Sequence, residues 1–119
     1  MDNNAPFGGY FPLADLDDSL YQEVYQFVIG KYDLLLTKTV ESVRYQIVQG
    51  TNFMIEFTNY PFSHDIYVVI AHKPLGATAP HVDHIYKNGV DIHNTIVTTS
   101  SSILGAFNYE ADTEFKGLY

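Results

Sequence analysis

Four of the five histidines lie between residues 72 and 93, together with two aspartates: His72, His81, His84, His93, Asp83 and Asp91. Imidazole and carboxylate groups are common zinc ligands, so these residue types could form a metal site. The segment that carries most of them is predicted to be a loop, where solvated histidines are far commoner than metal ligands. We therefore predict no metal site.

A run of hydroxyl side chains at residues 98–102 offers a second kind of chemistry, nucleophilic attack. No Gly-x-Ser-x-Gly turn surrounds it, so a solvated strand edge or loop is the simpler interpretation. The chain has no cysteine, which excludes a thiol nucleophile, a thiolate metal site and disulfides. The paired carboxylates of Asp17 and Asp18 suit the start of a helix. We predict no enzyme activity, no catalytic residue and no cofactor.

The composition is that of one folded domain covering residues 1–119. Apolar residues make up 46 % of the chain and aromatic residues 15 %, which is enough for one core. Six basic residues stand against 14 acidic ones, and the net charge is −8. Because the basic residues are scattered singly, neither nucleic acid nor a membrane surface is an expected partner.

The sequence also bears on the compartment. No basic start followed by an apolar run resembles a signal peptide, and no apolar stretch is long enough to span a bilayer. Together with the absence of cysteine, these features favour the cytoplasm. A secreted protein that had lost its signal would show the same features.

One helix is predicted near the start of the chain. Residues 1–12 show no period and are expected to form a flexible arm. After them, apolar side chains share one helical stripe: Leu20, Val24, Phe27 and Val28. This spacing predicts an amphipathic helix over residues 16–34. Gly30 lies inside it at a cost of about 1 kcal/mol relative to alanine, so we expect it at a close helix–sheet contact.

The period then changes to two. Residues 39–48 and 51–58 alternate between apolar and polar side chains, and Gln49-Gly50 between them supplies a turn, which predicts a β-hairpin. Residues 66–72 are rich in β-branched side chains and predict a third strand. Prolines and glycines interrupt residues 73–102, which are expected to be a long loop, with 92–99 as a candidate extra strand. A last strand is predicted over residues 103–110.

These elements predict an α+β domain in which an antiparallel sheet packs on one helix. At this point the chain resembles the cystatins, and in particular the cysteine-free stefin branch. The similar segments are Gly8-Gly9, Phe27–Tyr32, Gln46–Asn52, Ala71–Gly76 and Glu114–Leu118. The resemblance implies a sheet of four to five strands wrapped around one long helix. Residues 73–102 depart from it as a long second-loop insertion.

Two further departures concern known variants of the family. The chain has no tryptophan, so the Pro-Trp pair found in the second loop of secreted cystatins is absent. Asp33-Leu34-Leu35 stands where some secreted cystatins carry a Ser-Asn-Asp segment that acts against legumain. Legumain inhibition is therefore not predicted.

The resemblance implies a reversible, tight-binding inhibitor of papain-like cysteine proteases of the cathepsin L, B and H type. Three segments would form a wedge that blocks the active-site cleft. The implied protease-binding residues are Pro6, Phe7, Gly8 and Gly9 in the arm, Gln46, Ile47, Val48, Gln49 and Gly50 in the first hairpin, and Pro74, Leu75 and Gly76 in the second loop.

Each segment has a distinct implied role. Val48 would supply the apolar contact of the hairpin tip, and Gly50 the positive φ that a Cβ would prevent. Gln46 would hold the loop shape and offer amide hydrogen bonds. Phe7 would fill a substrate-side pocket, and Leu75 would be the apolar contact of the second loop.

Two other interpretations remain open. The first is a cystatin-fold module that binds a protein or small ligand through its long loop and does not inhibit proteases. The second concerns assembly: the protein is expected to be a monomer, and a strained hairpin tip also favours a domain-swapped dimer.

Overall fold

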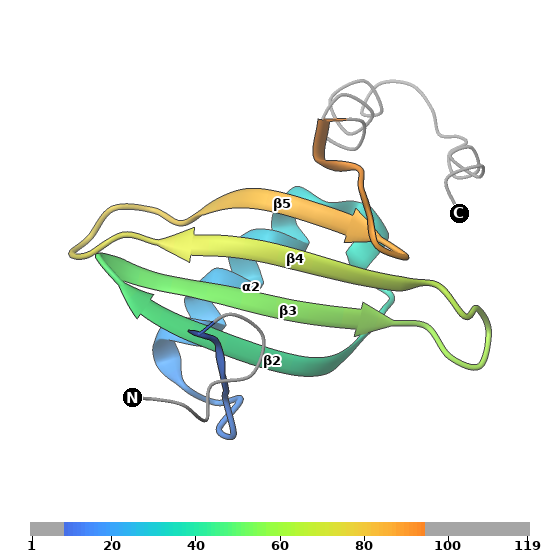
Figure 1. Ribbon diagram of the computed structural model, residues 1–119, viewed down its shortest axis with the longest axis horizontal. Helices are drawn as coiled ribbons and strands as arrows, with labels where there is room; N and C mark the ends of the chain where they lie inside the picture. The colour runs from blue at the N-terminus through green and yellow to red at the C-terminus, as the bar shows by residue number, and fades with distance from the viewer. Residues whose placement is uncertain (1–8, 95–119) are drawn as a thin grey trace.

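The computed structural model describes residues 9–94 of the 119-residue chain. These residues form one six-stranded antiparallel sheet in which each strand pairs with its neighbours in sequence, and α2 lies against one face of it (Figure 1). The predicted α+β class is confirmed. The elements are β1 (Phe11–Pro12), α2 (Ser19–Lys31), a 3₁₀ turn (Asp33–Leu35), β2 (Thr39–Val48), β3 (Gly50–Thr58), β4 (Ile66–Lys73), β5 (His81–Lys87) and β6 (Val90–Asp91).

Helix α2 begins at a side-chain cap and ends where the backbone becomes extended. The Asp18 carboxylate accepts a hydrogen bond of 2.9 Å from the Tyr21 N–H, which satisfies one of the free donors of the first turn. Tyr32 has φ −124° and ψ 96°, outside the helical region. The helix is therefore shorter than the predicted 16–34, because the last apolar residues of that stretch lie in the 3₁₀ turn.

The buried stripe of α2 consists of Tyr21, Val24 and Val28. Gly30 lies on the exposed face, and a Cβ built there has no atom within 4 Å. The prediction of a close helix–sheet contact at Gly30 was therefore wrong. The helix tolerates this glycine without needing it for packing.

Alternation in the central strands builds the other half of the core. Every second residue of β3 and β4 faces the helix and is buried: Phe53, Ile55, Phe57, Tyr67, Val69 and Ala71. Successive side chains in a strand point to opposite faces, so the remaining residues lie on the outer face of the sheet. That outer face is turned toward the viewer in Figure 1, with α2 behind it.

The predicted hairpin and third strand are confirmed. Strands β2 and β3 pair from Thr39↔Thr58 to Val48↔Gly50, so that Gln49 forms the turn. Strand β4 coincides with the predicted 66–72 to within one residue. These elements are the ones with the clearest period of two.

The prediction of a long second-loop insertion over residues 73–102 was wrong for the residues of β5, because this strand pairs with β4 along its length. The loop between these strands is only residues 74–80. A register shift pairs Ile70 with His84 and Ala71 with Val82, so that Asp83 has no partner. This bulge places the buried residues Val82 and Ile85 three positions apart, which hides the strand's period.

The strand count also differs from the predicted four to five, because β1 and β6 add two strands of two residues each. Such short strands are too brief to show a period in the sequence. The predicted strand over 103–110, most of the 92–99 segment and residues 1–8 of the arm lie outside the described residues.

Ile55→Ala should lower the free energy of unfolding by about 2–5 kcal/mol, because Ile55 has no exposed surface and the change leaves a cavity. Urea denaturation measures this difference. Ile47→Ala is the matched control: Ile47 is 69 % exposed, so its loss should change stability by less than about 0.5 kcal/mol. Equal effects of the two changes would contradict the described core.

Candidate functional site

Two connections that are far apart in sequence meet at one end of the sheet, the β2–β3 hairpin tip at 46–50 and the β4–β5 loop at 74–80, and Gly9 lies beside Gln46 of this tip. We call these residues the hairpin end. Figure 1 shows the turn and the loop side by side at the left, while the connection at 59–65 lies at the opposite end. Antiparallel pairing of β2, β3 and β4 produces this meeting, because alternate connections return to the same end of a sheet.

Gly50 lies in close contact with the start of the loop. Its φ is +103°, a conformation that residues with a Cβ rarely adopt. A Cβ at this position would collide with the carbonyl oxygen of Lys73 and lie 3.0 Å from the Cα of Pro74. Both atoms belong to the backbone and cannot move aside as a flexible side chain would. A glycine is thus required for the turn to rest on the start of the loop.

Gln46 is held by a row of polar side chains that crosses the outer face of the sheet. Its Oε1 accepts a hydrogen bond of 2.9 Å from the Asn52 amide. The Asn52 Oδ1 lies 2.6 Å from Nδ1 of His72, which therefore carries the proton as donor. A Cβ on Gly9 would lie 3.2 Å from the Gln46 Nε2, so the arm leaves the domain beside this row. The role of Gln46 in holding the loop shape stays a prediction.

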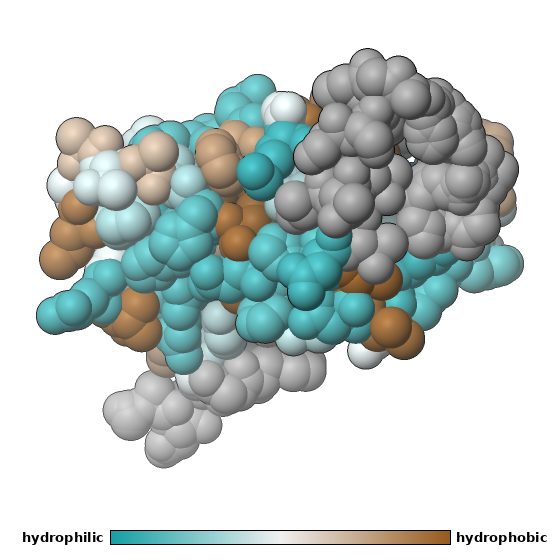
Figure 2. All heavy atoms as spheres, turned by 90° about the horizontal axis from the view of Figure 1, so that it is seen from above, coloured by the Kyte–Doolittle hydropathy of each residue, from teal (hydrophilic) through white to brown (hydrophobic). Residues whose placement is uncertain are grey.

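Apolar side chains at the hairpin end are uncovered. Ile47 is 69 % exposed, Val48 is 47 % exposed and Leu75 is 72 % exposed. Figure 2, in which the same end stays on the left, shows apolar atoms there beside hydrophilic ones. Single exposed apolar residues are ordinary, but three exposed at the same end of the sheet are suited to contact with another protein.

Lys73 is a part of this site that sequence reasoning missed. It is 5 % exposed, and its ammonium donates to the carbonyl oxygens of Gly76 at 3.1 Å and Thr78 at 2.6 Å. The same nitrogen lies 3.3 Å from a carboxylate oxygen of Glu23 on α2. The loop is thus folded around one charge and joined to the helix. The signal was present: Lys73 occupies the next inward-facing position of β4 after Ala71.

The structure brings together most of the predicted protease-binding residues. Those at the hairpin end are Gly9, Gln46, Ile47, Val48, Gln49, Gly50, Pro74, Leu75 and Gly76. Gln49 is exposed at the turn, and Gly76 adopts a φ of +80° in the loop. Pro6, Phe7 and Gly8 lie outside the described residues.

The histidine-rich segment forms separate pairs. His81 lies 3.1 Å from the Asp83 carboxylate, and His84 lies 3.1 Å from that of Asp91. Within residues 9–94, no three histidine, aspartate or glutamate side chains come together in a way that could hold a metal ion. Within the same residues no helix is long and apolar enough to cross a membrane.

The chain matches no protein-family model, no curated protein and no solved structure. Any functional conclusion therefore depends on its own residues and their arrangement.

Gly50→Ala should lower the free energy of unfolding by at least about 1–3 kcal/mol, because the new side chain requires a strained φ and meets fixed backbone. Gly30→Ala is the control, since its Cβ would enter open space on an exposed helix face; it should raise stability by up to about 1 kcal/mol. Thermal or urea denaturation measures both. A Gly50→Ala protein as stable as the original would disprove the close packing of the turn on the loop.

Lys73→Met should loosen the β4–β5 loop, because methionine fills the space but cannot donate to the two loop carbonyls. We expect the backbone order parameters of residues 75–79 to fall from about 0.85 toward 0.6 or below, measured by ¹⁵N relaxation. Lys31→Met removes an exposed lysine and should leave these values unchanged. Unchanged order in the Lys73 variant would mean that the loop does not depend on the ammonium.

Proposed function

We propose that this protein is a reversible, tight-binding inhibitor of papain-like cysteine proteases of the cathepsin L, B and H type. The observation that carries the proposal is the hairpin end, where the exposed Val48 turn adjoins the Leu75 loop and the arm lies beside Gln46 at Gly9. In the same proposal the sheet wraps around α2 in the manner of the stefins. The order of helix, hairpin and strands along the chain supports it.

Inhibition of this kind needs shape and no catalytic group. A papain-like protease holds its cysteine and histidine across an open cleft, and the hairpin end would enter that cleft as a wedge. Val48 and Leu75 would lose their exposed apolar surface to the enzyme, at about 25 cal/mol for each Å² removed from water. No peptide bond of the wedge would lie in line for attack, so the inhibitor would stay intact.

Rigidity at the hairpin end favours tight binding. The packing of Gly50 on the loop, the hydrogen bond between Gln46 and Asn52, and the Lys73 contacts hold both loops in place before any partner arrives. A preorganised surface loses less conformational entropy on association, which increases affinity without new contacts. The arm contributes Pro6, Phe7 and Gly8 in the proposal, with Phe7 in a substrate-side pocket.

The proposal predicts stoichiometric inhibition of papain at nanomolar concentration. Val48→Asp should weaken the inhibition constant by more than about tenfold, or about 1.4 kcal/mol, because a carboxylate would lose its water in an apolar contact. Val90→Asp is the matched control: this valine is 63 % exposed on β6, away from the hairpin end, and its change should leave inhibition intact. Competition kinetics with a fluorogenic peptide measures both.

A folded, unmodified protein that does not inhibit papain or cathepsin L at micromolar concentration would refute the proposal. A binding module without inhibitory activity would then be the better interpretation. Equal inhibition by the Val48→Asp and Val90→Asp proteins would instead remove the hairpin end from the mechanism.

A further inference from the structure

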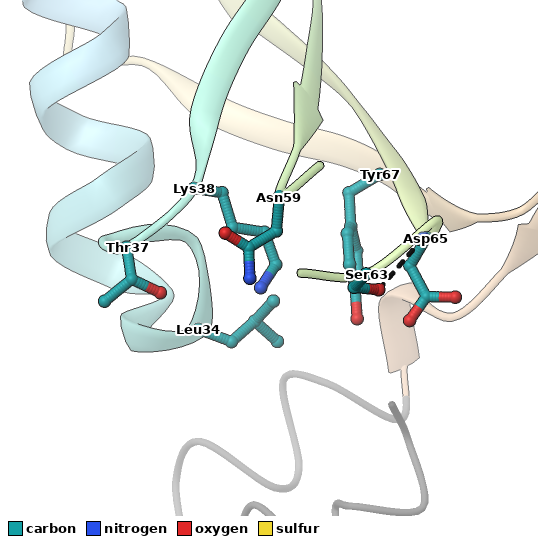
Figure 3. Close-up of a pocket in the computed structure, with 7 residues that line it drawn as sticks. All are labelled: Leu34, Thr37, Lys38, Asn59, Ser63, Asp65 and Tyr67. Carbon is teal, nitrogen blue, oxygen red and sulfur yellow. Dashed lines mark hydrogen bonds between the residues drawn. The ribbon is translucent and has the colours of Figure 1, made fainter. Parts of the chain in front are cut away.

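A pocket lies at the end of the sheet opposite the hairpin end. Its volume is about 370 Å³, and it lies between the segment that precedes β2 and the connection from β3 to β4. Its lining residues include Leu34, Thr37, Lys38, Asn59, Ser63 and Tyr67, drawn in Figure 3. The proposed inhibitory function uses none of them.

Lys38 is the unusual group in this pocket. Its side chain is half-buried, and its ammonium makes no hydrogen bond or ion pair with any of residues 9–94. The nearest favourable contact is the ring of Tyr67, whose centroid is 5.2 Å from the nitrogen. Burial lowers the pKa of Lys38, Asp65 partly offsets this effect, and Lys87 adds to it. Charges removed from water are normally paired, so this ammonium is suited to an incoming anion.

Asp65 does not fill that need, because its carboxylate is already engaged. One oxygen accepts a hydrogen bond of 2.9 Å from the Asn88 amide, and the other lies 3.8 Å from the ammonium of Lys87. These contacts, the Asn88 hydrogen bond first, lower the pKa of Asp65. Figure 3 shows Lys38 on one side of the pocket and the Asp65 carboxylate on the other. The Asp65 carboxylate is thus held by Asn88 and Lys87, and it makes no ion pair with Lys38.

The remaining lining residues define what kind of anion fits. Ser63 accepts a hydrogen bond from the Asp65 N–H at 3.0 Å, and a side-chain hydrogen bond from Ser63 also lowers the pKa of Asp65. Asn59 and Thr37 add an amide and a hydroxyl. Leu34 and the ring of Tyr67 supply an apolar wall. A volume near 370 Å³ is in the range of small-molecule sites and far exceeds that of a single inorganic ion.

We propose that this pocket binds a small organic carboxylate, with the carboxylate on the Lys38 ammonium and the apolar body against Leu34 and Tyr67. The site is separate from the hairpin end, so it does not depend on the inhibitory function. Either proposal can fail while the other holds.

The test is a ¹H–¹⁵N titration of the full chain with three probes: sodium benzoate, neutral benzamide and inorganic phosphate. Benzoate should give saturable shifts at the amides of residues 34–38 and 59–67. Lys38→Met should weaken benzoate binding by more than about tenfold, since the charge that pairs with the carboxylate is gone. Lys31→Met removes an exposed lysine on α2 and should leave binding unchanged.

Three outcomes would overturn the proposal. If benzamide binds as tightly as benzoate, the charge is not recognised. If phosphate binds as tightly as benzoate, the apolar wall is not used. Benzoate binding that survives the loss of Lys38 would place the anion elsewhere. Lys38→Gln provides a second variant, which keeps a polar side chain without the charge. If the Lys38→Met protein does not fold, the Lys38→Gln protein must show the same loss of benzoate binding.

Discussion

The contact between Gly50 and the backbone of Lys73 and Pro74 is the constraint on which the hairpin end depends. It joins a turn of one strand pair to the loop of the next, so that two separate connections behave as one surface. Only a residue without a Cβ permits this approach, and only a positive φ orients the turn for it. The polar row through Gln46 and the ammonium of Lys73 then fix what lies on each side of that contact.

Two lysines removed from water, Lys73 and Lys38, lie at opposite ends of the sheet and have different surroundings. Lys73 finds two carbonyl oxygens and a carboxylate, which replace the water that its ammonium loses. Such a group is satisfied and stabilises the loop around it. Within residues 9–94, the ring of Tyr67 is the one favourable contact of the Lys38 ammonium, while the nearby carboxylate of Asp65 is held by other groups. The first arrangement is structural, and the second leaves binding capacity unused.

The sequence predicts the fold well where side chains repeat with a regular period. The helix stripe and the alternation in β2, β3 and β4 were visible because each buried residue lies at a constant spacing from the next. Strand β5 was missed because its bulge breaks that spacing. The contacts of Lys73 and the isolation of Lys38 could not be predicted, because they depend on which loop atoms come near each ammonium in three dimensions. The motif residues 46–50 identified the hairpin tip, but their packing on the loop required the structure.

Exposure at the hairpin end follows from the architecture and not from an irregular strand. Ile47 lies on the same face of β2 as Val43, which is 4 % exposed, yet Ile47 is 69 % exposed. Four residues of strand extend about 13 Å, so the hairpin continues beyond the part of the sheet that is covered by the core. An inward-facing position that is mostly exposed within the described residues would be filled equally well by a polar side chain if solubility alone mattered. An apolar residue there, with Val48 and Leu75 exposed at the same end of the sheet, is the arrangement expected of a surface completed by a partner.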